Sequence, residues 1–389
     1  MAAIAIVGAG LLGRLTAWQL AHNHSVTLFD KDSKQGVNSA AYTAAGLLTP
    51  YGESLSCEPD IVEMGIVALT QWPTLLCELP SAVDFQVKGS LCVSHAQDQG
   101  DYLRFVRHIE QCYPQAALKK LASEELSQVS AAIAQRFGTG AFIPGEGCID
   151  NHQLLEALTH ALELAEVKWH QHTLVKAISP YTVKYENHAG EDKLKRFDLV
   201  IDCRGIGASV GESESQDESA LTELRPVRGE VLRVRAPEVD FKLPVRLMHP
   251  RYKLYISPKA NHEYVIGATE IESGDTSGVT IRSSLELLSA LYSLHPGFAE
   301  AEILEQLSHR RPAFADNKPK VINQSGLLQL NGLYRHGYLL APVMLSVGVY
   351  LAKQQLNPTE AIEAPPFLSN LVTHILGEEI AGCNAQVIG

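Results

Sequence analysis

The chain has 389 residues, of which 46% are hydrophobic and 20% are charged, enough for two domains or for one domain with a large insert. Its formal net charge of −12 argues against a nucleic-acid partner, because nucleic-acid binders present basic surfaces. No apolar run has the roughly 20 residues of a membrane span, and the apolar start runs straight into glycines, so it predicts a buried strand rather than a signal peptide.

The first thirty residues predict a strand–helix–strand unit. Residues 3–7 form a short, continuous apolar run, which is typical of a parallel strand covered on both faces. Residues 11–21 have helical composition without proline, and residues 25–29 predict a second strand.

Three glycines and one acid mark the ends of these elements. In the pattern GxGxxG, Gly8 permits a tight turn, Gly10 lets the backbone approach a pyrophosphate, and Gly13 lets the helix pack on the strand. The helix start offers free N–H groups to phosphates, and Asp30 at the end of the second strand can accept hydrogen bonds from ribose hydroxyls. Together these features predict a bound dinucleotide, either FAD or NAD, and the motif alone does not choose between them.

Helices are expected to dominate up to residue 165. The small and polar residues of 39–53 favour a short helix and a loop over a strand. Helices are predicted at 60–79 and 99–112, a strand at 88–94, and a turn followed by a long helix within 143–165, with Asp150 or Asn151 as its N-cap.

The remainder of the chain alternates between the two element types. Strands are expected between 172 and 186 and at 197–205, and the alternating residues of 224–270 predict antiparallel strands. Helical periodicity returns at 281–294. Residues 327–355 begin as a strand, turn at a glycine and continue as an apolar helix, whose N-terminus could point back at the nucleotide.

The cysteines and histidines show no metal-binding or catalytic pattern. The seven cysteines lack a CxxC pair or metal-type spacing, so we expect reduced thiols in a cytoplasmic protein. The 15 histidines are scattered, which predicts no metal site. The sequence lacks GxSxG, the motif that carries the nucleophilic serine of many hydrolases, which argues against a hydrolase.

Seven ordered motifs run along nearly the whole chain. They are GAGLLG (8–13) with Asp30, AAGLL (44–48), GEGCIDNHQLLEAL (145–158), LRPVRGEVL (224–232), LYISPK (254–259) with VIGATEIESGDTSGVT (265–280), RRPAFADNKP (310–319) and GLYRHGYLLAP (332–342). In this order they resemble FAD-dependent amine and amino-acid oxidases of the D-amino-acid oxidase superfamily, most closely its glycine oxidase branch.

The resemblance implies the fold class and its division. It implies an α/β protein with a Rossmann-like FAD-binding domain of the glutathione-reductase type and an inserted substrate domain of antiparallel sheet plus helices. We expect the discontinuous FAD-binding domain to comprise residues 1–85, 140–223 and 306–389, and the substrate-binding domain to comprise 86–139 and 224–305.

The resemblance also implies non-covalent FAD rather than NAD, since no cysteine matches a covalent flavin attachment. The glycines of the GxGxxG turn and their neighbours would lie along the ADP half of the FAD, with one backbone position further along the chain near the adenine. The segment around Gly46 would line the flavin, and the turn before the last long helix would wrap the isoalloxazine ring. In chain order the implied residues are Gly8, Gly10, Leu11, Leu12, Gly13, Asp30 and Lys31 for the ADP half, Ala45, Gly46 and Leu47 for the flavin, Val175 for the adenine side, Gly205 at the end of the third strand, and the turn from Leu333, with Arg335, His336, Gly337, Tyr338 and Leu339.

An amino-acid oxidase must fix a carboxylate, and the planar fork of an arginine binds both of its oxygens. Arg311 stands where the family keeps this arginine, Arg335 matches a second arginine near the flavin, and Tyr255 matches a tyrosine on the roof of the pocket. The alternatives are a surface ion pair for Arg311, an exposed turn for Arg335 and a core tyrosine for Tyr255. The family transfers a hydride to flavin N5 and leaves the imine to hydrolyse, so these residues would act by positioning.

Four positions depart from the glycine oxidase pattern. Leu333 stands where a histidine is common, and His336 replaces an asparagine. Lys253 and Glu270 would change the charge of the pocket if they face it, and Glu270 could then accept a cationic amine. The alternative is an ion pair of these two residues across neighbouring strands.

The sequence thus predicts an enzyme that oxidises the C–N bond of a small amine such as glycine, sarcosine or a D-amino acid. The alternatives are a flavoenzyme that modifies a protein side chain or a tRNA base, and a flavin-binding protein without turnover. A homo-oligomer or a protein partner remains open.

Overall fold

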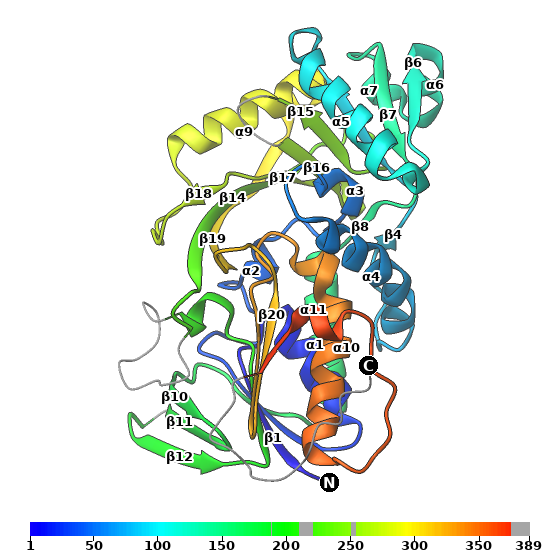
Figure 1. The fold of residues 1–389 in the computed structure, drawn as a ribbon. Coiled ribbons are helices and arrows are strands. Elements are labelled where there is room, and N and C mark those ends of the chain that lie inside the picture. The colour runs from blue at the N-terminus through cyan, green and yellow to red at the C-terminus, as the bar shows by residue number, and fades with distance from the viewer. Residues whose placement is uncertain (188, 210–220, 250–253, 375–389) are drawn as a thin grey trace, which may run out of the picture.

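The computed structural model describes residues 1–187, 189–209, 221–249 and 254–374 (Figure 1). Its two large sheets have seven and nine strands. In Figure 1 the seven-stranded sheet lies in the lower half with β1 and β20, and the nine-stranded sheet lies in the upper half beneath α9.

The seven-stranded sheet has the order β22-β20-β21-β13-β1-β2-β9. The five strands from β21 to β9 are parallel, whereas β20 runs antiparallel to β21. The strands are β1 (Ala3–Val7), β2 (Ser25–Phe29), β9 (Lys168–His170), β13 (Leu199–Asp202), β20 (Lys320–Gln324), β21 (Leu327–Asn331) and β22 (Val372–His374).

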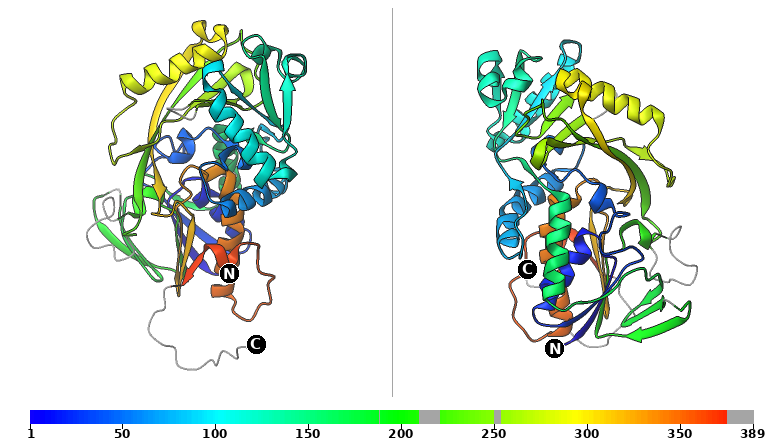
Figure 2. Two further views of the ribbon diagram at one scale, coloured as in Figure 1. Left: turned by 45° about the horizontal axis from the view of Figure 1, so that its top comes forward. Right: turned by 180° about the vertical axis from the view of Figure 1, so that it is seen from behind.

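Both faces of this sheet are covered, which explains the continuous apolar run of β1. Ile4 and Ile6 belong to the core formed with the helices, and Ala5 and Val7 pack under a three-stranded sheet on the other face. The helices are α1 (Leu11–Ala21), α4 (Pro59–Cys77), α8 (Asn151–Leu164) and α10 (Gly337–Leu356), and the small sheet contains β10 (Val175–Ser179), β11 (Thr182–Glu186) and β12 (Asp192–Arg196). Seen from behind, α8 lies beside α1 (Figure 2).

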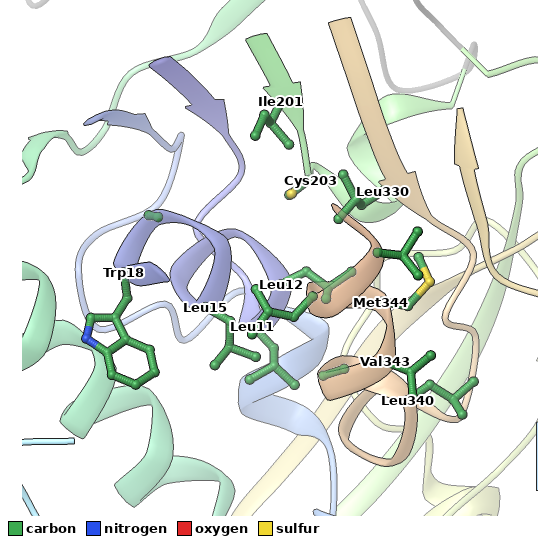
Figure 3. Close-up of a cluster of buried hydrophobic side chains, with 14 of the residues drawn as sticks. Leu11, Leu12, Leu15, Trp18, Ile201, Cys203, Leu330, Leu340, Val343 and Met344 are labelled. Carbon is green, nitrogen blue, oxygen red and sulfur yellow. The ribbon is translucent and has the colours of Figure 1, made fainter. Parts of the chain in front are cut away.

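The helix core is the largest apolar cluster, and α10 runs through it. Among the described residues, α10 is the one helix long and apolar enough to cross a bilayer, and 61% of that apolar stretch is buried in the protein. Figure 3 labels side chains that meet between α1, α10 and the ends of β13 and β21, namely Leu11, Leu12, Leu15, Ile201, Cys203, Leu330, Leu340, Val343 and Met344. Trp18, also labelled, belongs to the same core but points away from α10 on the other side of α1.

The nine-stranded sheet is mainly antiparallel and carries α9 (Ile281–Leu294) on one side. Its strands are β5 (Ser90–Ser94), β6 (Lys119–Ala122), β7 (Thr139–Ile143), β14 (Arg225–Arg235), β15 (Val245–Met248), β16 (Leu254–Pro258), β17 (Glu263–Gly267), β18 (Ile271–Glu272) and β19 (Glu302–Ala313). Helices α5 (Gln99–Cys112), α6 (Ser123–Val129) and α7 (Ala131–Ala134) lie in the segment that links β5 to β7.

The remaining elements are short. They are α2 (Ala40–Thr43), β3 (Leu47–Leu48), α3 (Pro50–Glu53), β4 (Phe85–Gln86), β8 (Gly147–Ile149) and α11 (Leu368–Leu371), with 3₁₀ turns at Ala96–Asp98, Pro114–Ala116, Gly205–Ala208, Ala260–His262 and Pro296–Glu300.

The predicted fold class is confirmed, and so is the predicted N-cap of the helix that begins at Asn151. The Asp150 side chain caps α8 by accepting hydrogen bonds from the backbone N–H groups of His152 and Gln153, both at 3.0 Å. The proposed division of the chain stays a prediction, and its boundaries at residues 140 and 306 fall inside β7 and β19 of the nine-stranded sheet.

Candidate active site

A cavity of about 1310 Å³ is lined by residues of both large sheets and of the segments that connect them. Segments far apart in the sequence meet around it, as expected where the carboxyl ends of parallel strands face inserted loops. The main contributing stretches are 7–12, 29–33, 36–41, 43–47, 173–175, 203–207, 268–272, 306–312 and 330–339.

The glycine-rich turn forms one end of the cavity. Gly8 has a φ of +97°, and a Cβ there would lie 2.6 Å from the carbonyl oxygen of Cys203, so only glycine fits. A Cβ at Gly10 would meet nothing within 4 Å, which leaves the backbone open to the cavity. Asp30 accepts hydrogen bonds from the backbone N–H groups of Ala9 and Asp32, and burial raises its pKa. This end therefore has the open backbone that a pyrophosphate requires.

The segment Ala45–Gly46–Leu47 is held in place by a buried lysine. The ammonium group of Lys259 donates hydrogen bonds to the carbonyl oxygens of Ala45, at 2.8 Å, and Ile149, at 2.7 Å. Burial lowers the pKa of Lys259, which is 8% exposed. The lysine thus fastens the cavity-lining segment to the end of β8.

The N-terminus of α10 forms another wall. His336 is its N-cap residue, and its imidazole is buried with no hydrogen-bond partner among the described residues. Burial lowers the pKa of His336 to about 4, so the ring is neutral at pH 7. Tyr338 in the first turn accepts a hydrogen bond from Trp72 at 3.0 Å and donates one to Ala41 at 3.0 Å, which fixes the helix start.

Two glycines make room for the side chains of Arg311 and Tyr255, which line the same cavity. A Cβ at Gly229 would lie 2.1 Å from a terminal nitrogen of Arg311, and a Cβ at Gly267 would lie 2.9 Å from the hydroxyl of Tyr255. Arg311 donates to the carbonyl oxygen of Thr269 at 3.1 Å and has no carboxylate partner in the described part of the chain. Burial raises the pKa of Tyr255, so its hydroxyl stays protonated and can donate.

A chain of alternating charges lies beside Arg311. Arg335 forms ion pairs with Glu53 at 2.7 Å and with Glu270 at 3.0 Å, and Glu53 also pairs with Arg246. The Arg335–Glu53 contact is an ion pair without hydrogen-bond geometry, so Oε2 of Glu53 lacks a hydrogen-bond donor. Burial alone would raise the pKa of Glu53, but the guanidinium groups of Arg335 and Arg246 outweigh it and hold the pKa far below its ordinary value.

Every site residue predicted from the sequence lines this cavity except Gly13. A Cβ at Gly13 would lie 1.7 Å from the carbonyl oxygen of Gly8, so Gly13 serves the packing of α1 against the turn. Glu270 does face the cavity, where it accepts hydrogen bonds from Tyr334, at 2.6 Å, and Arg335. Lys253 lies outside the described residues. The catalytic and cofactor roles of these residues stay predictions.

Sequence reasoning missed Glu53, Arg246 and Lys259. Glu53 ends a four-residue helix and Arg246 lies on β15, and their contact joins positions 193 residues apart. Lys259 was quoted only as the last residue of a motif. No local pattern marks these residues, because their partners come from distant segments.

The cavity fits an FAD. It exceeds the 300–1,000 Å³ typical of small-ligand pockets. The cavity runs from the open backbone of Gly10 at one end to the N-terminus of α10, at Gly337, at the other. This suits an extended dinucleotide whose phosphates lie at the first end and whose flavin ring lies at the second.

The family model described as "FAD dependent oxidoreductase" matches residues 3–351. The chain belongs to this family. The resemblance to the D-amino-acid oxidase superfamily and its glycine oxidase branch is therefore confirmed, and this FAD-dependent oxidoreductase is an enzyme.

Individual relatives cover nearly the whole FAD-dependent oxidoreductase. It is 35% identical over 342 residues to a putative thiamine biosynthesis oxidoreductase, ThiO, of Rhizobium etli, covering 88% of this chain and 93% of that protein. It is 27% identical to a glycine oxidase of Geobacillus kaustophilus, covering 96% and 97% of the two chains. The crystal structure of glycine oxidase from Geobacillus kaustophilus matches the fold with a TM-score of 0.77, over 97% of this chain and all of that one.

Proposed function

We propose that this enzyme oxidises the C–N bond of a small α-amino acid of the glycine type, with non-covalently bound FAD, in the cytoplasm. The similarity to a glycine oxidase and to ThiO supports a small amine over a protein side chain or a tRNA base as substrate. The name of the Rhizobium etli relative further supports a place in thiamine biosynthesis.

The observation that carries this proposal is Arg311. Its guanidinium lines the cavity beside Tyr255, and no described carboxylate neutralises it. A half-buried arginine whose guanidinium has no carboxylate partner, next to a protonated tyrosine, supports a binding site for a carboxylate. The nucleotide-binding turn and this site belong to one cavity, so substrate and cofactor would meet there.

The residues of this chain act by binding and by excluding water. Arg311 binds the carboxylate through its N–H groups, and Tyr255 donates a further hydrogen bond to it, which together orient the Cα–H bond. FAD supplies the hydride acceptor when bound. The first turn of α10 directs the positive end of its dipole into the cavity, where it stabilises negative charge. Imine hydrolysis needs only water.

An anaerobic panel of amines tests the proposal. The holoenzyme is mixed with glycine, sarcosine, D-alanine and, as a comparison, L-alanine and methylamine, which lacks a carboxylate. We expect loss of the flavin absorbance band with glycine or sarcosine and none with methylamine. Reduction by no member of the panel, or equal reduction by methylamine, would contradict the proposed substrate class.

A further inference from the structure

A buried ammonium group lies directly behind one wall of the cavity. Nζ of Lys259 donates hydrogen bonds to the carbonyl oxygens of Ala45 and Ile149, and the residue is 8% exposed. Ala45 and Gly46 line the cavity, and a Cβ at Gly46 would lie 3.3 Å from this Nζ. The missing side chain at Gly46 therefore lets the ammonium group lie close to the backbone that forms the wall.

This wall belongs to the end of the cavity where α10 begins. Leu47 follows Gly46, starts β3 and also lines the cavity. β3 packs against α10, and the first residue of α10, Gly337, lines the same cavity. Ala45 and Leu47 also share an apolar cluster with Tyr255. The ammonium group thus lies behind the end of the cavity that suits the flavin ring, not behind the glycine-rich turn.

No carboxylate of the described residues forms an ion pair with Lys259. Both of its hydrogen-bond acceptors are backbone carbonyl groups, which carry dipoles but no net charge. Burial lowers the pKa of Lys259. The titratable groups that act on it electrostatically are Cys148, Asp84, Asp150 and Arg233. Because no anion contacts the ammonium group and little water surrounds it, its field is weakly screened and extends into the cavity.

The charge of a flavin changes when it accepts a hydride. A hydride carries one proton and two electrons, so its transfer to a neutral oxidised ring leaves a ring with one negative charge unless a further proton follows. A nearby buried cation stabilises this anion and has little effect on the neutral ring. The equilibrium between the two forms then shifts toward the reduced one.

We propose that Lys259 raises the reduction potential of bound FAD, because its ammonium group stabilises negative charge on the reduced flavin through the Ala45–Gly46–Leu47 wall. Lys259 thereby does more than hold this segment in place. The inference goes beyond the proposed function, since it concerns the cofactor and does not depend on which amine the enzyme oxidises.

The midpoint potential of bound FAD tests the inference without any substrate. It is measured at pH 7 by equilibration of the holoenzyme with a reference dye. Lys259→Met removes the charge and keeps an unbranched side chain, whereas Lys259→Gln removes the charge and keeps an N–H donor. We expect each variant to lower the equilibrium constant for flavin reduction at least tenfold, which is about 30 mV for this two-electron couple.

The protonation of the reduced flavin gives a second measurement. A cation that stabilises the anionic form lowers the pH at which this form takes up a proton. In both variants that pH should therefore rise by one unit or more, followed by the absorption spectrum of the reduced flavin. If Lys259→Met does not fold, Lys259→Gln decides the question, because its amide can still donate to a carbonyl oxygen.

A matched control separates the charge from a loss of structure. Lys242→Met removes a lysine whose side chain is 74% exposed and pairs with Asp240, and it should leave the potential unchanged. If Lys259 only fastens the segment, its variants would bind FAD more weakly in both oxidation states, at an unchanged potential.

A potential that stays within a threefold change of the equilibrium constant in both Lys259 variants would overturn the inference. So would an unchanged protonation of their reduced flavin. Failure of the proposed function is a separate result, because it is shown by the absence of flavin reduction with any amine, whereas the potential is measured without an amine.

Discussion

At the scale of single residues, the candidate site depends on which charges are already paired. Arg311 and Arg335 are predicted from the sequence as a similar pair, but their surroundings differ. Arg335 contacts two carboxylates, and Arg311 contacts a backbone carbonyl. Replacing Arg335 therefore removes ion pairs within the protein, whereas replacing Arg311 removes a guanidinium that no described carboxylate neutralises.

Replacing Arg311 should abolish substrate binding with little effect on the flavin. Arg311→Met removes charge-assisted hydrogen bonds worth about 1.5–3 kcal/mol each, so we expect kcat/KM for the amino acid to fall about 100- to 1,000-fold. Arg311→Lys keeps the positive charge but loses the planar guanidinium, so its kcat/KM should lie between those of wild type and Arg311→Met. Steady-state kinetics with the best amine, together with the flavin spectrum, measures this. A methionine variant within threefold of wild type would refute the assignment.

His336 should make the protein less stable in acid. Burial lowers its pKa to about 4 in the folded state, whereas an unfolded histidine titrates near 6.5. Between these values the unfolded state binds the extra proton, so stability falls as pH drops from 6.5 toward 4, by up to about 2 kcal/mol at pH 5.

Urea unfolding at pH 7 and pH 5 measures this effect. His336→Asn should lose less stability than wild type over this interval. His22→Asn, which replaces an exposed histidine, should behave like wild type. An equal acid sensitivity of wild type and His336→Asn would show that His336 does not cause it.

At the scale of elements, paired strands place the side chains that we propose bind the substrate. β14 and β19 are antiparallel over eleven residues of β14, and Gly229 pairs with His309, two positions before Arg311. The bare backbone of Gly229 lets the guanidinium of Arg311 lie across the strand pair. Strand pairing and one glycine thus fix the position of the arginine.

Gly229→Ala should reduce activity far more than stability. The new Cβ would overlap a terminal nitrogen of Arg311, which is the far end of a flexible side chain and can move away. We expect a fall in kcat/KM approaching that of Arg311→Met, with a loss of at most about 1–3 kcal/mol in the free energy of unfolding. Gly138→Ala, where a Cβ meets nothing within 4 Å, is the control. Full activity of Gly229→Ala would contradict this placement.

Local signals in the sequence predicted some elements well and missed others. The cap residue Asp150 and the helical periodicity of 281–294 act over a few positions, and the structure has α8 and α9 there. β19 lacks a clear apolar alternation in EILEQLSHRRPA and is a strand because β14 pairs with it along its length. Glu53 and Lys259 were missed for the same reason, since distant partners give them their roles.

At the scale of the whole molecule, the cavity joins both sheets, so its ligand should stabilise the fold. The glycine turn after β1 lies at one end, and the start of α10, which crosses the helix core, lies at the other. A dinucleotide that contacts both ends binds only the folded chain, because the unfolded chain does not bring these segments together.

Removal of FAD should therefore lower stability measurably. Free FAD at a thousandfold its Kd should add about 4 kcal/mol to the free energy of unfolding of the apoprotein. ADP reaches only the glycine-turn end and should stabilise less at equal concentration. Urea unfolding of the apoprotein with each nucleotide measures this. Equal stabilisation by ADP would indicate that the ring end of the cavity contributes nothing to binding.

The alternating row from Arg246 to Glu270 also constrains how such an enzyme can change during evolution. Losing the buried Glu53 leaves the mostly buried guanidinium of Arg246 without its ion-pair partner, which typically costs about 3–5 kcal/mol, whereas exchanging this pair for uncharged residues of similar size can be almost neutral. Divergence toward new substrates would then proceed through coupled replacements. Among homologous sequences, positions 53, 246, 270 and 335 should vary together rather than one at a time.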